Sequence, residues 1–445
     1  MQIVVIIVLI TFSGALFTLI PGGEILQKLT IIGLVFIMLA MRQQISLSRR
    51  GLVLIWPFLV YFVIAILSAF LHSYSIAYTL AAIHSLLFGL IVYVWVINLN
   101  IKVEKLRGFT RLMYVIVVIQ FIFVLLKYFV HGIDEKVLIG TMSNTAGQLG
   151  FLFPAIVIPL LYFTTNRKNT LVTYALIAAM FLFGIINEKR AVIFLLPLIV
   201  FASIAINHIR SDYRIRHMWA SMIVGGIIVI SGVVIGLYTI PSLNPEESYG
   251  GNISLLHAYK YGIEYLTMDF GGSLQGSYKA AASDTGIQVG RVILWASIID
   301  WLKSVDTWTL LLGKGFGTAT PSIWLHEGSD ILFNIIGTRG AICGAGLALI
   351  ETGIVGFLTI GYWFIHIFLE LISAHRQVSS LTARRWFRTL MIIHFVFCFD
   401  FFFYSTVLMR TLPMPFIFFA LIASIALVKQ WDRALLCNET AMQTY

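Results

Sequence analysis

Charged residues are scarce in this chain of 445 residues: Asp, Glu, Lys and Arg together make up 11% of it, whereas 59% is hydrophobic. Soluble domains carry about 25% charged residues, so a soluble fold of this composition would have too little polar surface. The mean hydropathy is +0.94. These values exclude an ordinary soluble protein and predict an all-α, polytopic integral membrane protein.

Cysteine is scarce as well. The three cysteines, Cys343, Cys398 and Cys437, are widely separated, and no Cys-x-x-Cys spacing occurs. A disulfide framework or a zinc cluster needs more cysteines at closer spacing. We therefore expect no structural metal, no redox chemistry and no cofactor.

Apolar runs, by contrast, are long and numerous. A helix needs about 20 apolar residues to cross the ~30 Å hydrocarbon core of a bilayer, and we count about twelve runs that approach this length. They predict nine transmembrane helices within residues 1–240 and three within residues 340–430, followed by a polar tail at 431–445. The runs cover residues 2–21, 25–41, 52–71, 78–99, 109–130, 147–163, 170–187, 191–207, 218–240, 340–370, 387–409 and 413–430.

The net charge of +10 reflects basic residues on the cytoplasmic side of the membrane, and it does not predict a nucleic-acid partner. If both termini are cytoplasmic, five basic loops face the cytoplasm, as the positive-inside rule requires. Lys429 and Arg433 place the C-terminus on the same side. We therefore expect a multi-pass protein of the plasma (inner) membrane, in contact with its lipids. The basic loops are 42–50, 100–111, 164–169, 208–217 and 372–388.

Residues 241–339 form one long soluble-like segment, and this orientation makes it extracytoplasmic. Within it, residues 290–304 read GRVILWASIIDWLKS. This pattern predicts a short amphipathic helix lying on, or partly dipping into, the outer leaflet. Its broad apolar face consists of Ile293, Leu294, Trp295, Ile298, Ile299, Trp301 and Leu302.

A few basic residues lie on the predicted outer side, where the positive-inside rule disfavours them: Lys189, Arg190, Arg291, Arg339 and Arg410. Arginine suits diphosphate because its planar guanidinium donates two parallel hydrogen bonds and keeps its charge. Converging arginines would form an anion site, whose expected ligand is the diphosphate of a polyprenyl-linked sugar. Binding of lipid headgroups is the alternative. We favour that alternative for Lys189 and Arg410, and diphosphate binding for Arg190 and Arg291.

Four segments resemble motifs of the O-antigen ligase and Wzy-type polysaccharide polymerase superfamily. GRVILW and the later LLGKGFGT resemble the R-x-x-x-L-W and G-x-G-x-G pattern of that family's large external loop. ALIETGIVGFL, at 348–358, is similar to the L-x-E-x-G-I-x-G-L start of the next helix. NEKRAVIFLLPLIVF is similar to the S-x-x-R-x-x-x-L turn, with Arg190 at the Arg. The first four predicted helices match the family in hydropathy only.

The resemblance implies a membrane-embedded glycosyltransferase of the GT-C type that needs no metal. Its donor and acceptor would be undecaprenyl-diphosphate-linked oligosaccharides. Arg190 and Arg291 would bind the donor diphosphate and neutralise the charge that develops on it as it leaves.

The chain departs from the family pattern at one place. Ligases of this family usually carry a His shortly before the E-x-G, where it is a candidate base for the acceptor hydroxyl, but this chain has Ile342 and Cys343 there. Neither side chain is an ordinary base for a sugar hydroxyl at neutral pH. His326, in WLHEGSD, is the candidate replacement, and a solvated loop residue is the alternative interpretation. The missing His favours a polymerase over a ligase.

Polar residues in or beside the apolar runs are the remaining candidates. Asp400 lies in a predicted span, where a carboxylate is costly and often functional; a structural hydrogen bond or pairing with an external Arg is the alternative. Asn144 and Gln148 would touch donor sugar or cap a helix. Glu351 is expected to serve helix packing. Three histidines are expected to form interhelical hydrogen bonds: His84, His366 and His394.

These features predict a polymerase that transfers a growing lipid-linked glycan to a new lipid-linked repeat unit on the outer face of the membrane. An O-antigen ligase acting on lipid A core is the alternative within the superfamily. A twelve-span transporter or flippase for lipid-linked sugars is the alternative from another class. It predicts two similar halves, which the sequence does not show. A chain-length regulator is a candidate protein partner.

Overall fold

The computed structural model describes residues 33, 49–72, 76–98, 106–131, 149–164, 170–187, 190–208, 215–240, 243–246, 250–260, 291–319, 335, 342–404 and 417–429. Within these ranges the chain is mostly helical and contains no strand. The predicted all-α class is therefore confirmed for the part of the chain that is described.

The longest helices coincide with the predicted apolar runs. Between α10 and α16, the described residues include a helical turn at 255–260 and the helices α13 and α14. A further apolar helix spans Ile417–Lys429. The labelled helices are α4 (Arg49–Leu71), α5 (Ile76–Ile97), α6 (Leu106–His131), α7 (Leu149–Thr164), α8 (Thr170–Ile186), α9 (Arg190–His208), α10 (Ile215–Thr239), α13 (Arg291–Ser304), α14 (Thr307–Leu312), α16 (Gly344–Gln377) and α17 (Leu381–Phe403).

Four of the described helices are long and apolar enough to cross a membrane, and six others are apolar but shorter. The long ones correspond to α4, α10, α16 and α17. This supports a membrane-embedded protein, while the number of spans stays a prediction. The predicted runs 2–21 and 25–41 lie outside the described residues, and so does the tail at 431–445.

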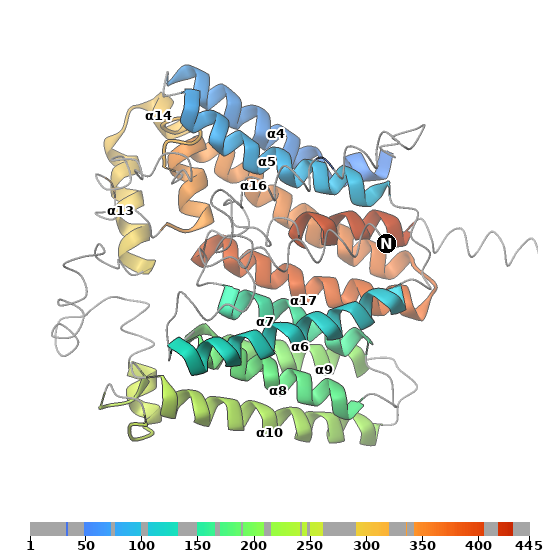
Figure 1. The fold of residues 1–445 in the computed structure, drawn as a ribbon. Helices are drawn as coiled ribbons and strands as arrows, with labels where there is room; N and C mark the ends of the chain where they lie inside the picture. The colour runs from blue at the N-terminus through green and yellow to red at the C-terminus, as the bar shows by residue number, and fades with distance from the viewer. Residues whose placement is uncertain are drawn as a thin grey trace, which may run out of the picture.

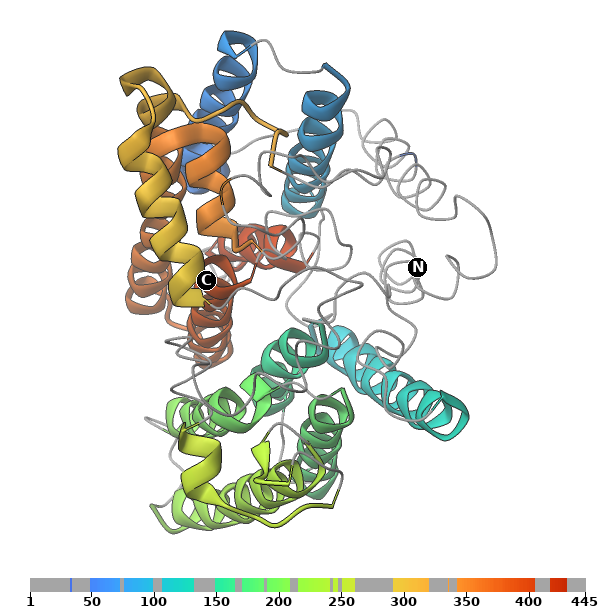
Figure 2. The same cartoon turned by 90° about the vertical axis from the view of Figure 1, so that its left-hand side faces the viewer.

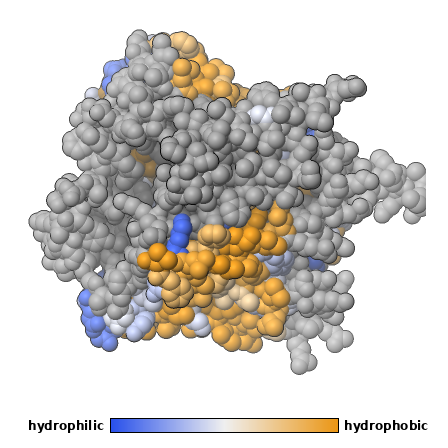
Figure 3. All heavy atoms as spheres, viewed as in Figure 1, coloured by the Kyte–Doolittle hydropathy of each residue, from blue (hydrophilic) through white to orange (hydrophobic). Residues whose placement is uncertain are grey.

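The outer surface of the described helices is apolar where lipid is expected. Along α10, Ile223, Ile227 and Ile230 are each about three-fifths exposed. Figure 3 shows a continuous hydrophobic area over the lower helices, with hydrophilic atoms beyond one end of it. Exposed apolar side chains over such an area are costly in water and favourable in a bilayer.

The long helices run side by side in two groups (Figure 1). In one group, α16 packs on α4 and α17, and α4 also contacts α5. In the other group, α6 to α10 pack on one another. Helix α17 joins the groups because it also contacts α7 and α9. Helices α13 and α14 lie at one end of the bundle, beside α16 (Figure 2).

Aromatic side chains hold α16 to its neighbours. Trp363 is fully buried, and its ring centroid lies 4.7 Å from that of Phe58 on α4 and 5.4 Å from that of Phe418. Its indole Nε1 donates to the carbonyl of Leu54 at 2.8 Å. A buried Trp needs such a partner for its N–H, so Trp363 fixes the register of α16 against α4.

The connection between α16 and α17 is shorter than predicted. Residues 372–388 were expected to be a loop, but α16 continues to Gln377 and α17 begins at Leu381. The cause is local: Ser380 caps α17, its Oγ accepting from the Ala383 N–H at 3.4 Å. The arginines of this region therefore lie in helix ends. Arg388 is buried there and donates to the carbonyl of Ile206 at 3.0 Å and to His375 Nε2 at 2.9 Å.

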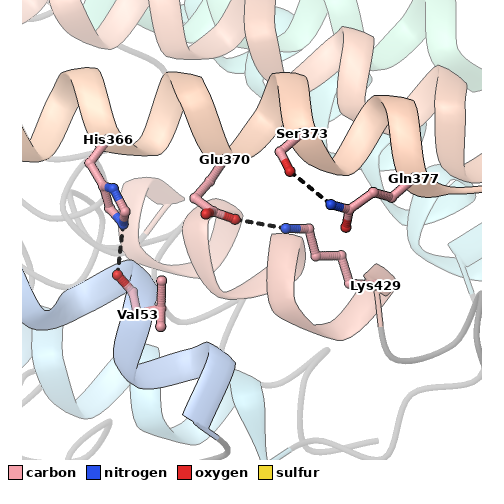
Figure 4. Close-up of polar contacts among 6 residues, drawn as sticks. All are labelled: Val53, His366, Glu370, Ser373, Gln377 and Lys429. Carbon is pink, nitrogen blue, oxygen red and sulfur yellow. Dashed lines mark hydrogen bonds and ion pairs between the residues drawn. The ribbon is translucent and has the colours of Figure 1, made fainter.

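A row of polar side chains follows one face of α16 toward that same end (Figure 4). His366 Nε2 lies 2.8 Å from the Val53 carbonyl of α4, and His394 Nε2 on α17 lies 2.9 Å from the Phe364 carbonyl. Both bonds join helices, so the prediction for these two histidines is confirmed. The side chain of His84 is outside the described set.

Further along the same row, Lys429 Nζ pairs with Glu370 Oε2 at 2.7 Å. This pair connects α16 to the Ile417–Lys429 helix, and its side chains are only 15% and 26% exposed. Removing either partner leaves a half-buried charge, which costs about 1–2 kcal/mol, between the values for exposed and buried pairs.

We therefore expect Glu370→Ala and Lys429→Ala each to lower the melting temperature of the detergent-purified protein, and Glu370→Lys with Lys429→Glu to recover most of the loss. Gln377→Ala, which removes an exposed hydrogen bond to Ser373 on the same face, is the matched control and should change little. If the charge-swapped variant, Glu370→Lys with Lys429→Glu, recovered none of the loss, the ion pair would contribute nothing to stability.

Candidate functional site: contact between the α13–α14 segment and α16

Helix α14 begins with a strong cap. The Asp306 carboxylate accepts from the N–H groups of Trp308 at 3.0 Å and Thr309 at 3.1 Å, and from the Thr309 hydroxyl at 2.6 Å. Hydrogen bonding, first of all from that hydroxyl, lowers the pKa of Asp306. A lowered pKa means that the cap is fully formed at neutral pH and is lost only when the pH falls below this lowered value.

Helix α14 ends at Gly313, where the chain turns onto α16. Gly313 has φ 80° and ψ −170°, a backbone region that is essentially restricted to glycine. A Cβ there would overlap the backbone of Glu351. The glycine is therefore needed for two reasons: its backbone conformation and the close approach of two main chains.

Helix α16 is broken where this turn meets it. Gly353 has φ 65° and ψ −167°, so residues 344–352 and 354–377 form two helical pieces. A Cβ on Gly353 would overlap the Leu311 carbonyl. The apolar run predicted over 340–370 coincides with a candidate membrane span, Gly344–Gln377, and the helix is interrupted at Gly353.

The break releases carbonyl groups of α16 that would otherwise accept within the helix, and the α14 loop binds them. The N–H of Lys314 donates to the Ile350 carbonyl at 2.8 Å, and that of Gly315 donates to the Glu351 carbonyl at 3.2 Å. Free backbone groups in a bundle of apolar helices need such partners. The break and the loop therefore stabilise each other.

Helix α4 supplies a third partner through Ser68, which is fully buried. The Ser68 hydroxyl lies 2.5 Å from the Leu312 carbonyl and 2.7 Å from the Glu351 carbonyl, and donates its proton between them. We call this arrangement the clasp: Ser68 of α4, residues 311–319 after and at the end of α14, and residues 350–353 of α16.

The carboxylate of Glu351 completes the clasp from the side of α16. It is 1% exposed, and its Oε1 accepts from the N–H of Ala319 at 3.0 Å. Within the loop, Thr318 donates to the Gly315 carbonyl at 2.7 Å. The expected packing role of Glu351 is thus observed, and it includes a specific hydrogen bond to the loop.

Helix α13 rests on the short first piece of α16. Ile298 is fully buried, and a Cβ added to Gly346 would lie 2.7 Å from Ile298 Cδ1. The N–H of Gly344 donates to the Tyr404 carbonyl at the end of α17, at 2.6 Å. The apolar face predicted for residues 290–304 therefore packs at least partly on protein, while Ile299 is 46% exposed.

The two arginines assigned to diphosphate each begin a helix: Arg190 is the first residue of α9 and Arg291 the first of α13. The far end of α9 contacts Arg388, and Arg388 in turn contacts the last turn of α16 through His375. Hence α9 begins at the end of the bundle where α16 begins and α13 packs. The side chains of both arginines lie outside the described set.

Most other predicted site residues are also outside the described ranges, so their roles remain predictions. Asp400 is described: it is fully buried in α17, one turn from the end of that helix. Sequence patterns did not single out Ser68 or Gly353 for the site, although Gly353 lies within the quoted ETGIVG motif. The residues outside the described ranges are Asn144, Gln148, Lys189, His326, Arg339 and Arg410.

Ile342 and Cys343 are both buried where α16 begins. Ile342 is 3% exposed, and Cys343 is fully buried. Cys343 caps α16, its Sγ accepting from the Gly346 N–H at 3.3 Å. Among the described residues, no group of three or more His, Cys, Asp or Glu is placed to hold a metal ion.

The described structure thus defines a class: an all-helical protein whose apolar helices suit a membrane, with a two-helix segment clasped onto one end of the bundle. No family model matches the chain, and no curated protein matches it significantly.

Proposed function

We propose that this protein is a polysaccharide polymerase of the plasma membrane that joins undecaprenyl-diphosphate-linked repeat units on the outer face. The growing lipid-linked glycan is the donor, and a new lipid-linked repeat unit is the acceptor. The proposal rests on the arginines of the predicted outer side and on the motif resemblance, together with one structural observation.

That observation is the clasp. Two of the segments that carry the resemblance, LLGKGFGT and ALIETGIVGFL, lie in direct backbone contact through Lys314 and Ile350. The helix that carries the third, GRVILW, packs on the same half of α16 through Ile298. A common site is expected to bring together motifs that are far apart in the sequence, and these three meet at one end of the bundle.

The proposed chemistry is a glycosyl transfer. A hydroxyl of the acceptor sugar attacks the anomeric carbon of the donor, and the bond from that carbon to the diphosphate oxygen breaks, leaving its electron pair on the diphosphate. Arg190 and Arg291 would stabilise this charge with paired hydrogen bonds. The proton of the acceptor hydroxyl would pass to a base, for which His326 is the candidate.

The ligase alternative would use the same donor site but needs a different acceptor. The ligase His is replaced in this chain by the buried Ile342 and the capping Cys343, which favours the polymerase. A transporter of inverted repeats would pair two broken helices. Among the described helices, α16 has a non-helical residue inside it, Gly353, and prolines lie inside α4, α7 and α9.

A deletion strain separates these functions through its glycan pattern. Loss of a polymerase should leave single repeat units on lipid, and complementation should restore a ladder of long chains. Long chains that stay on the lipid carrier would indicate a ligase instead, and accumulation of single repeats on the inner face would indicate a flippase.

A further inference from the structure

We propose that Glu351 is a positioning residue for the proposed transfer, because its carboxylate fixes the clasp and thereby the helix that begins with Arg291. This inference rests on the proposed function in one respect, the role of Arg291 in binding diphosphate. The mechanical part, that Glu351 holds the α13–α14 segment on the bundle, stands on described contacts alone.

The carboxylate of Glu351 is buried. Glu351 is 1% exposed and lies in a half-helix whose residues from Gly344 to Gly353 are all buried. Burying a carboxylate is costly unless hydrogen bonds compensate. One such bond comes from the backbone of Ala319, 32 residues earlier in the chain. A residue that served packing alone would not need a hydrogen-bond acceptor at this depth.

The clasp is linked to α13 through a short connection. Only Val305 and Asp306 separate α13 from α14, and Asp306 is committed to the cap of α14. Because this connection is so short, α13 cannot move far unless α14 moves. The clasp fixes the end of α14 at Gly313, and Glu351 holds the loop six residues further on, at Ala319.

Contacts other than that of Glu351 also hold the loop on the bundle. Backbone bonds of Lys314 and Gly315 hold the near side of the loop, and Ser68 bridges the two main chains. Thr79 of α5 donates to the Phe316 carbonyl at 3.3 Å, which is a long hydrogen bond. Among the described contacts, Glu351 therefore provides the side-chain acceptor that holds the far side of the loop, at Ala319.

Limited proteolysis tests the mechanical part without reference to activity. Trypsin cleaves after Lys314 only if the loop leaves α16, since the Lys314 N–H is bonded to the Ile350 carbonyl. In detergent-purified protein we expect Glu351→Ala to speed this cleavage by about tenfold or more, because cleavage follows the population of the open form. Glu351→Gln should cleave like the wild type, since its amide oxygen still accepts from Ala319.

Two further variants serve as a backup and a control for this test. Ser68→Ala removes another side-chain contact of the clasp and should also speed cleavage, so it replaces Glu351→Ala if that variant is not recovered folded. Gln377→Ala lies at the opposite end of α16 and should have no effect. A wild-type rate of cleavage after Lys314 in folded Glu351→Ala would overturn the role of Glu351, and a wild-type rate in Ser68→Ala as well would overturn the clasp itself.

Inorganic diphosphate tests the positioning part. In a polymerisation assay it should compete for the arginine site, and Glu351→Ala should raise its inhibition constant by about tenfold, with recovery in Glu351→Gln. Loss of folded protein alone would lower the rate without moving this constant. An unchanged constant together with faster cleavage would retain the clasp and reject the link to Arg291. If the wild-type protein showed no polymerase activity, the proposed function would be rejected, and the proteolysis result would remain valid.

Discussion

Arg190→Ala and Arg291→Ala should each abolish long-chain glycan, while the protein remains inserted and lipid-linked single repeats accumulate. Under the proposed function, each substitution removes a fork of charge-assisted hydrogen bonds to the leaving diphosphate. Loss of one preorganised group that stabilises developing charge typically lowers turnover by about 10²–10³-fold. The measurement is the glycan ladder of a deletion strain complemented with each variant, with membrane insertion checked by immunoblot of the membrane fraction.

The chain offers matched controls for this result. Lys303→Ala removes a cation from the same helix as Arg291, but Lys303 pairs with Asp300 at 2.8 Å and both side chains are more than 70% exposed. It should leave the ladder intact. Arg291→Lys keeps the charge but not the planar fork, so it should give short chains. Normal chain lengths in both Ala variants would refute the assigned roles.

Gly353→Ala should yield little folded protein. Its backbone lies in a region that is essentially restricted to glycine, which costs an alanine about 1–3 kcal/mol. The added Cβ would also overlap the Leu311 carbonyl, and a main chain cannot move aside as the end of a flexible side chain can. We expect a loss above about 3 kcal/mol in total, measured as the yield of monodisperse protein in detergent and as its melting temperature.

Gly361→Ala is the control, since Gly361 lies in the regular part of α16 and a Cβ there meets nothing within 4 Å. It should be neutral or slightly stabilising, because alanine has the higher helix propensity. If Gly353→Ala were as stable as Gly361→Ala, neither the break in α16 nor the close approach of the two backbones would depend on glycine.

The helices could be predicted from the sequence because runs of apolar residues leave few alternatives to a helix in lipid. Their ends were harder to predict. Arg384, Arg385 and Arg388 were expected to lie in a loop, since basic residues usually mark loops in such sequences. They belong to α17 because Ser380 caps that helix and Arg388 finds buried partners on α9 and α16.

The break in α16 could not be predicted from local pattern. Glycine is common in membrane helices, and ETGIVG is compatible with a continuous helix. The conformation of Gly353 depends on the backbone of residues 311–315, which lies about forty positions earlier in the chain. N–H groups of this segment donate to the carbonyls of Ile350 and Glu351. A tertiary contact of this kind leaves no periodic signal in the sequence.

The candidate site was predicted in part. The helix predicted over 290–304 is observed as α13, and its place on the outer leaflet stays a prediction. The sequence could not reveal that part of the apolar face of α13 packs on Gly346 through Ile298 instead of facing lipid, since both environments select the same side chains. The roles of the arginines stay predictions.

Purified protein in liposomes, supplied with lipid-linked repeat units and no ion gradient, tests the central claim most directly. The proposed polymerase should convert single repeats into a ladder of longer lipid-linked glycans and release undecaprenyl diphosphate, one for each bond formed. Repeats that stay single, with or without movement across the bilayer, would contradict it.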